Sequence, residues 1–493
     1  MKKKTPIFYS ALMLTGVNLL LRLAGTTFQV YISGLIGAAG VGLLQLVLSV
    51  GGMALTAGMA GIRTSTMYLT AEELGKKRPQ NVRWVLSGCI TYSLICSGVI
   101  AAALYRFAPV LASHWIGDSR TVGAVRMVAC FLPVNCLCGV MTGYFTAANR
   151  IGTLAAVEVG EQLCSMAVTM GMLLMWAQSD PARSCQAVVL GSGVGGCMTL
   201  VTLTVLRLRE RAGSGKKLPI RKRLLQTAAP LALADDLKAG ISTTENLMVP
   251  KRLARYPGTA DPLAAFGTVC GMVFPVLMFP AAILFALAEL LIPELARCNA
   301  AGSKNRIEYL TKRSLRVALL YGCLFGGFLF LLSRELCMAL YDSQDAGIYL
   351  QRFSLLAPML YCDAITDAMT KGLGQQKICV RYNILTSAMD VALLFLLLPR
   401  FGMGGYYFSF LVTHLINFVL SLRRLLIITK IKIPIKIPVL TILCAVGAVW
   451  AASFVAPVIL RAAVFALVFA CLLVLSQVVG KEDVQWIKGL VKA

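Results

Sequence analysis

The chain has 493 residues, of which 58% are hydrophobic, and a mean hydropathy of +0.77. This apolar content exceeds that of ordinary soluble domains, so the composition excludes a soluble globular protein. The formal net charge of +25 indicates contact with anionic membrane lipids and no nucleic-acid partner, because the basic residues are spread over separate loops without a recognisable binding module.

Apolar stretches recur along the whole chain. Each reaches the roughly 20 residues that a helix needs to cross a hydrocarbon core of about 30 Å. In chain order they lie at about 8–34, 40–70, 83–106, 121–148, 152–177, 184–208, 224–250, 262–293, 314–333, 347–370, 378–398, 402–422, 438–459 and 462–480. The sequence therefore predicts an all-α integral membrane protein with about fourteen transmembrane helices.

Lysine and arginine gather in every second loop. About 33 of the 47 basic residues lie at one set of loop ends, and about 11 lie at the opposite set. Short loops that are rich in Lys and Arg stay in the cytoplasm, so we expect a multi-pass protein of the cell membrane with both termini cytoplasmic.

Two groups of six spans follow one another. Glu73-Leu74-Gly75-Lys76 after span 2 is echoed by Glu294-Leu295-Ala296-Arg297 after span 8, about 220 residues later. We expect a parallel repeat of six-helix lobes with a substrate site at their interface. The predicted domains are an N-terminal lobe (1–208), a basic cytoplasmic linker (209–223), a C-terminal lobe (224–430), and two further helices with a basic tail (431–493).

Polar residues recur at helical spacing inside three spans. A charged group in a bilayer costs about 2.5–3.5 kcal/mol, so such residues should face protein or a water-filled cavity. The sequence predicts that both halves contribute residues to one polar wall. The candidate substrate-binding residues are Asn18, Arg22 and Gln29 in span 1, Arg63 on one line with Thr56 in span 2, and Asp235, Lys238, Glu245 and Asn246 in span 7.

A purely structural interpretation of these residues stays open. Asp235 or Asp236 could pair with Lys238, Arg63 could reach the membrane surface, and small polar residues could serve helix packing. Gly191 and Gly195 form a GxxxG pattern that is typical of close helix packing.

Carboxylates deep in the spans are candidates for coupling to a cation. We expect this role for Glu245 and Asp390, and Asp363 and Asp367 are weaker candidates four residues apart. The segment Gly213 to Lys217 lacks the earlier glycine and the Ser or Thr of a nucleotide-binding loop, so an ion gradient, the membrane potential or downstream consumption would supply energy. The sequence suggests no cofactor, metal site or catalytic residue.

Several segments resemble the multidrug/oligosaccharidyl-lipid/polysaccharide (MOP) flippase superfamily, and most closely its stage V sporulation protein B group of polysaccharide-biosynthesis membrane proteins. The resemblance covers nearly the whole chain. It is carried by Arg22-Leu23-Ala24-Gly25, Gly40-Val41-Gly42, the segment from Phe266-Gly267 to Phe279-Pro280, Leu291-Ile292-Pro293-Glu294-Leu295 and Gly372-Leu373-Gly374.

The resemblance implies a flippase that moves a lipid-linked oligosaccharide or peptidoglycan precursor from the cytoplasmic to the outer leaflet by alternating access. Such activity would serve cell-wall, spore-cortex or polysaccharide synthesis, with a lipid-linked sugar diphosphate as substrate and cell-wall synthesis proteins as partners. Lipid II flippases of this superfamily carry several cavity arginines. Here only Arg22, Arg63 and Lys238 lie within spans, beside several carboxylates.

Three other functions stay open at this point. A cation-coupled multidrug exporter of the same superfamily would use the carboxylates for cationic drugs. A membrane-embedded glycosyltransferase would need larger extracytoplasmic loops, and the only histidines are His114 and His414, so we expect no enzyme activity. A non-transporting scaffold would tolerate charge changes inside the spans.

Overall fold

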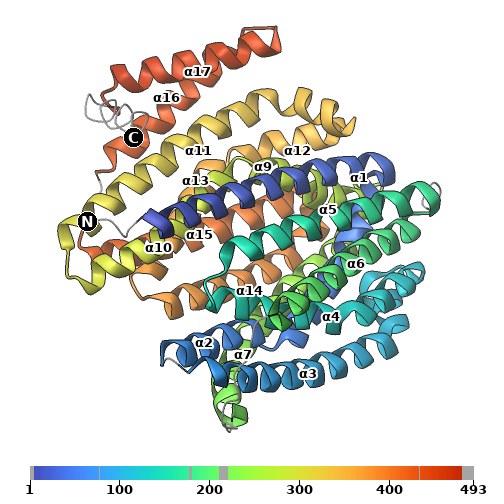
Figure 1. Ribbon diagram of the computed structural model, residues 1–493. Coiled ribbons are helices and arrows are strands. Elements are labelled where there is room, and N and C mark those ends of the chain that lie inside the picture. Colours follow the sequence, from blue (N-terminus) through green and yellow to red (C-terminus); the bar gives the residue numbers. More distant parts are fainter. Residues whose placement is uncertain (1–4, 77, 177–179, 210–219, 432–433, 480–493) are drawn as a thin grey trace. The chain divides into compact units, whose positions relative to one another are not determined.

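The computed structural model describes residues 5–76, 78–176, 180–209, 220–431 and 434–479, and these contain helices and no strand, as expected (Figure 1). The helices are α1 (Thr5–Met59), α2 (Ile62–Gly75), α3 (Val82–Val110), α4 (Val122–Ala147), α5 (Ile151–Trp176), α6 (Pro181–Leu208), α7 (Ile220–Leu253), α8 (Pro262–Gly267), α9 (Phe274–Met278), α10 (Ala281–Ala300), α11 (Lys304–Tyr341), α12 (Gln344–Ser354), α13 (Ala357–Gly372), α14 (Gln376–Phe401), α15 (Met403–Thr429), α16 (Lys436–Ser453) and α17 (Val458–Leu475). Short helical turns are η1 (Pro79–Asn81), η2 (Leu111–Ile116), η3 (Ser119–Thr121) and η4 (Thr268–Val273).

All fourteen expected spans fall on these helices. In the described part of the chain, ten helical segments are long and apolar enough to cross a membrane, and the bent pair Pro262–Met278 and Ala281–Ala300 makes an eleventh. One of the ten, Leu19–Gly75, has 57 residues and contains the second expected span and part of the first. The expected spans 224–250 and 347–370 are not counted, because α7 carries several charges and because the second is divided between α12 and α13.

The first two expected spans lie largely on one bent helix, α1. A kink at Gly37, with φ 67° and ψ 174°, bends α1 between the spans expected at 8–34 and 40–70. The segment expected as the second span contains a break at Ala60 and Gly61, whose φ angles are 42° and 69°. The hydroxyl of Tyr92 on α3 donates to the carbonyl oxygen of Ala60 at 3.4 Å and holds this break.

The chain divides into two compact units: unit 1 contains Met1–Gly267 with Leu394–Gly402, and unit 2 contains Thr268–Leu393 with Met403–Ala493. The predicted lobe boundary would place α7 in the second lobe, whereas α7 packs against α1, α2 and α3 in unit 1. Residues 210–219 of the predicted linker lie outside the described residues. The parallel six-helix lobes stay a prediction.

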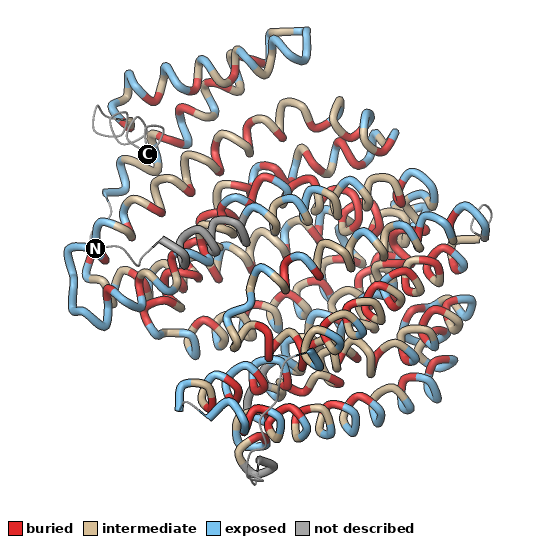
Figure 2. The backbone as a smooth tube through the Cα atoms, in the orientation of Figure 1, coloured by how far each residue is buried: buried red, intermediate tan, exposed pale blue. Residues whose placement is uncertain are grey.

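Unit 1 is held together by close helix contacts around an apolar core. A Cβ atom at Gly191 would lie 2.7 Å from the carbonyl oxygen of Ser165, and a Cβ atom at Gly195 would lie 3.1 Å from the carbonyl oxygen of Glu161. These distances confirm the close helix packing expected for Gly191 and Gly195. The core between α2, α3, α4 and α6 is built around residues such as Phe145 and Leu203, and the tube in Figure 2 marks buried positions along these helices.

Unit 2 ends in the helical pair α16 and α17, which packs on α11. Phe465 and Phe469 of α17 stack with ring centroids 5.8 Å apart, and the Phe465 ring meets Gly327 of α11, where a side chain would clash. Arg461 of α17 forms an ion pair with Glu335 of α11 at 2.7 Å. Both helices keep an apolar outer face, which is typical of contact with lipid.

Candidate substrate cavity

A cavity of about 470 Å³ opens in unit 1 where α1 ends and α2 begins. One wall is the last turn of α1, the break and the first turn of α2, and the other wall is one face of α7. The described residues that line it are Leu55, Thr56, Met59, Gly61, Ile62, Arg63, Thr64, Asp235, Lys238, Ala239 and Ser242.

The cavity brings together three of the predicted charged residues. Arg63, Asp235 and Lys238 all line it, and all three side chains are exposed. In the described residues neither Asp235 nor Asp236 forms an ion pair with Lys238, so the expected local pairing is not observed. Two cations and one carboxylate therefore line one cavity.

The position of Arg63 depends on the break between α1 and α2. Because Ala60 and Gly61 adopt left-handed backbone angles, α2 starts in a new direction and Arg63 is its second residue. Behind it, α4 approaches so closely that a Cβ at Gly143 would lie 2.5 Å from the carbonyl oxygen of Arg63. Arg63 also lies close enough to Glu158 on α5 for their charges to interact.

Hydrogen bonds between α1 and α7 fix the wall next to the cavity. Asn246 Nδ2 donates to Ser49 Oγ at 2.9 Å, and Thr243 Oγ1 donates to the Ser49 carbonyl oxygen at 3.1 Å. Asn246 was predicted to bind substrate, but its amide links two helices in this structure.

The other predicted residues do not line this cavity. Arg22 is exposed and Gln29 half-buried on the part of α1 before the kink, and Glu245 is half-buried two turns after Lys238 on α7. The side chain of Asn18 lies outside the described residues. The structure thus joins Arg63, Asp235 and Lys238 and leaves the first half of α1 apart from them.

Asp236, which the sequence offered as an alternative partner for Lys238, follows directly after the cavity residue Asp235. Its Oδ1 atom is buried and has no hydrogen-bond partner, although it neighbours a carboxylate that lines the cavity. A buried oxygen without a donor is rare and marks a position where a cation or donor could bind. Two adjacent carboxylates in an apolar span were the sequence signal for it.

Unit 2 contains a separate polar cluster around Asp390 of α14. Its carboxylate accepts hydrogen bonds from Ser409 Oγ at 2.5 Å and Thr413 Oγ1 at 3.2 Å, both on α15. One turn further, Asn417 Nδ2 donates to Asp363 Oδ2 on α13 at 3.0 Å. The buried Oδ1 atoms of Asp363 and Asn417 have no partner. Polar residues four apart on α15 were the signal that sequence reasoning overlooked.

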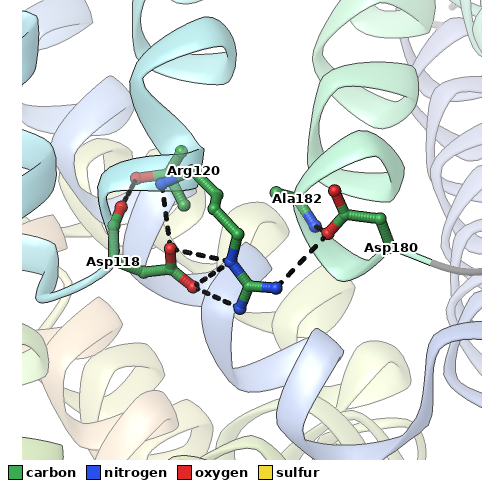
Figure 3. Close-up of polar contacts among 5 residues, drawn as sticks. Asp118, Arg120, Asp180 and Ala182 are labelled. Atoms are coloured by element: carbon green, nitrogen blue, oxygen red, sulfur yellow. Dashed lines mark hydrogen bonds and ion pairs between the residues drawn. The ribbon is translucent and has the colours of Figure 1, made fainter.

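Ion pairs join helices at both ends of unit 1. At one end, Arg223 of α7 forms ion pairs with Glu72 and Glu73 of α2. At the other end, Arg120 contacts Asp118 at 2.7 Å and Asp180 at 3.7 Å, so it bridges the loops before α4 and α6 (Figure 3). The hydrogen bond from Arg120 lowers the pKa of Asp118 below its ordinary value.

The chain is similar in sequence to known membrane transporters. Residues 14–170 match the family described as MatE. Stage V sporulation protein B of Bacillus subtilis (strain 168) is 22% identical over 417 residues, which cover 81% of this chain and 79% of that protein.

Solved structures share the fold. Lipid II flippase MurJ in an inward closed conformation matches with a TM-score of 0.70 and 12% identity, over 94% of this chain and 98% of that one. An inward-facing multidrug resistance MATE family transporter of the MOP superfamily matches with a TM-score of 0.66 and 12% identity, over 85% of this chain and 100% of that one.

The described residues form helices that are long and apolar enough to cross a membrane several times, in a fold that solved MATE and MurJ structures share. The resemblance expected from the sequence is confirmed by the matches in sequence and in fold. The chain is thus similar in sequence to the MatE family over residues 14–170 and in fold to solved transporters of the MOP superfamily.

Proposed function

We propose that the protein is a flippase that moves a lipid-linked oligosaccharide or peptidoglycan precursor from the cytoplasmic to the outer leaflet by alternating access. The observation that carries this proposal is the cavity that holds Arg63 and Lys238 together on helices of the membrane domain. The names of the sporulation protein and the lipid II flippase to which the chain is similar support it.

The chemistry of the cavity suits a charged head group. A diphosphate in hydrocarbon would lose its hydration, and a wet cavity avoids this cost. The guanidinium of Arg63 and the ammonium of Lys238 can donate charge-assisted hydrogen bonds to phosphate oxygens. Thr56, Thr64 and Ser242 line the same space and offer hydroxyls to sugar. The lipid tail would stay in the bilayer.

The predicted substrate-binding residues of span 1 lie on the first half of α1. Arg22 and Gln29 lie on α1 before the kink at Gly37 and do not line the cavity. A change in the bend at Gly37 would bring them nearer to a head group or take them away, which gives this kink a role in alternating access. Asn18 is retained in the proposal on its sequence position alone.

The energy source that we propose is a cation gradient coupled through Asp390, with Glu245 as the second candidate. Asp390 is only 7% exposed and is held by two hydroxyls of α15, so a bound cation or proton would change a defined set of contacts between α14 and α15. If transport and its ion dependence persist in both Glu245→Gln and Asp390→Asn, this coupling is wrong.

The test of the substrate is native mass spectrometry of the purified protein with a lipid-linked sugar diphosphate. Arg63→Gln should weaken binding about tenfold, because a hydrogen bond to a charged group contributes about 1.5–3 kcal/mol. Arg83→Gln, at an exposed arginine that begins α3, is the matched control and should bind as the wild type does. Equal binding by both variants contradicts the role of Arg63.

A cation-coupled multidrug exporter is the second candidate. Asp235 lines the cavity, the neighbouring Asp236 has a buried oxygen without a partner, and the fold matches a multidrug resistance transporter. Cationic drugs that bind the wild type but not Asp235→Asn, together with no binding of the lipid-linked sugar, would favour this function.

The proposal also includes location and partners. The charge distribution of the loops supports a location in the cell membrane with both termini in the cytoplasm. Anionic lipids would contact the basic loops, and cell-wall synthesis proteins would use the exported precursor.

A further inference from the structure

A second cavity, of about 390 Å³, lies at the last turns of α7 in unit 1. Its walls come from the C-terminal end of α7, from Trp115 in η2 and from Phe395 in the α14 segment that belongs to unit 1. Lys251, Arg252 and Arg255 line it, and the remaining described lining residues are aliphatic or Thr. The cavity thus combines three cations, two aromatic rings and an apolar floor, and no carboxylate is among its described lining residues.

The three cations have few partners of their own. Lys251 Nζ donates to the carbonyl oxygen of His114 in η2. The Arg252 guanidinium lies over the Phe395 ring, 3.1 Å from its centroid. Among the described residues none of the three forms an ion pair with a carboxylate. An anion that enters the cavity would therefore find the donors of two arginines still available.

This cavity is distinct from the substrate cavity. Lys251 comes thirteen residues after Lys238 on the same helix. At about 100° and 1.5 Å per residue, the two lysines are about 220° apart around α7 and about 20 Å apart along it. The two cavities therefore use nearly opposite faces and different levels of one helix.

We propose that the second cavity binds the phosphate group of an anionic ligand, with a lipid phosphate as the favoured source. The planar guanidinium matches two phosphate oxygens at once, which favours arginine pairs in phosphate sites. Tryptophan is enriched at the boundary between membrane and water, where Trp115 would lie beside a lipid head group. The site goes beyond the proposed function, since it needs neither the substrate cavity nor Arg63.

The test is binding of dioleoyl phosphatidic acid, measured by native mass spectrometry of the whole chain in detergent. A parallel titration uses inorganic pyrophosphate, which carries the same chemistry without a lipid. The variant Arg252→Ala/Arg255→Ala should weaken binding roughly tenfold or more, since two charge-assisted hydrogen bonds are lost. Lys251 is kept, because its contact with His114 joins two elements.

The matched control is Arg106→Ala/Arg183→Ala, which removes the same charge from exposed positions on α3 and α6. Weaker binding only in the Arg252/Arg255 variant supports the site, and the titration that responds identifies a lipid or a free anion as the source. Equal weakening in both variants, or no binding of either probe, overturns the proposal.

A second variant and a second binding measurement guard against misfolding and against an effect on the substrate cavity. If the alanine variant does not fold, Arg252→Lys/Arg255→Lys replaces it. That variant keeps the charge but loses the planar donors, and its binding should still fall by several-fold. Binding of the lipid-linked sugar diphosphate, which tests Arg63, should be unchanged in these variants, so failure of one site does not imply failure of the other.

Discussion

Gly143 packs α4 against the backbone that carries Arg63, and its replacement tests whether this approach is as close as the structure shows. In Gly143→Ala the new Cβ would lie 2.5 Å from the Arg63 carbonyl oxygen, 3.2 Å from Thr66 Cβ and 3.3 Å from Met67 N. Two of these three atoms belong to the backbone of α2, so no rotation of a side chain can relieve the contact. The helices must separate, or α2 must shift and carry Arg63 with it.

The expected cost follows from this geometry. Overpacking by one methyl in a well-packed site costs about 1–3 kcal/mol. For cooperative unfolding of the whole chain, with about 2.1 cal/mol/K of unfolding entropy per residue, this corresponds to a melting temperature lowered by about 1–3 °C. The assay is thermal unfolding in detergent, followed by intrinsic fluorescence.

The matched control is Gly98→Ala in the middle of α3, where an added Cβ would meet nothing within 4 Å. Alanine is the better helix former by about 1 kcal/mol, so this variant should melt at or slightly above the wild type. If Gly143→Ala is as stable as Gly98→Ala, the close approach of α4 to Arg63 is wrong. If it is less stable because α2 has shifted, binding of the sugar diphosphate should fall as well, since α2 carries Arg63.

Two further predictions concern hydrogen bonds of unit 1. Asn246→Ala removes the bond to Ser49 and should lower the free energy of unfolding by about 1 kcal/mol, measured by chemical denaturation, while an unchanged value would contradict the α1–α7 link. Asp118 has a lowered pKa beside Arg120, so its contribution is present above its ordinary pKa of about 3.9 and is lost as the pH falls through the folded value. Melting curves of the wild type and Asp118→Asn should differ at pH 7 and converge in acid, whereas a constant difference would refute this pairing.

The helical spans could be predicted because their signal is local. A run of about 20 apolar residues must form a helix in lipid, since the backbone donors and acceptors have no other partner there. The helical spacing of Asp235 and Lys238 likewise places them on one face of α7 before any tertiary contact is known. The match of all fourteen spans to helices follows from these rules.

Other features depended on contacts that a local pattern does not contain. No local pattern indicated the break within the span at 40–70, where the backbone turns at Ala60 and Gly61 and α3 supplies a hydrogen bond through Tyr92. The substrate contact of Asn246 stays a prediction, while the hydrogen bond from its amide to Ser49 of α1 joins residues far apart in sequence and was not predicted.

The sequence by itself determined that this is a helical membrane protein and which charged residues its membrane helices carry, because length and periodicity along one chain decide both. Only the tertiary structure decided that Arg63 and Lys238 share a cavity, and that Arg252 and Arg255 form a second one with Trp115. The physical reason is that a cavity forms where residues far apart in sequence meet. Which helix faces pack together depends on the shapes of many side chains at once.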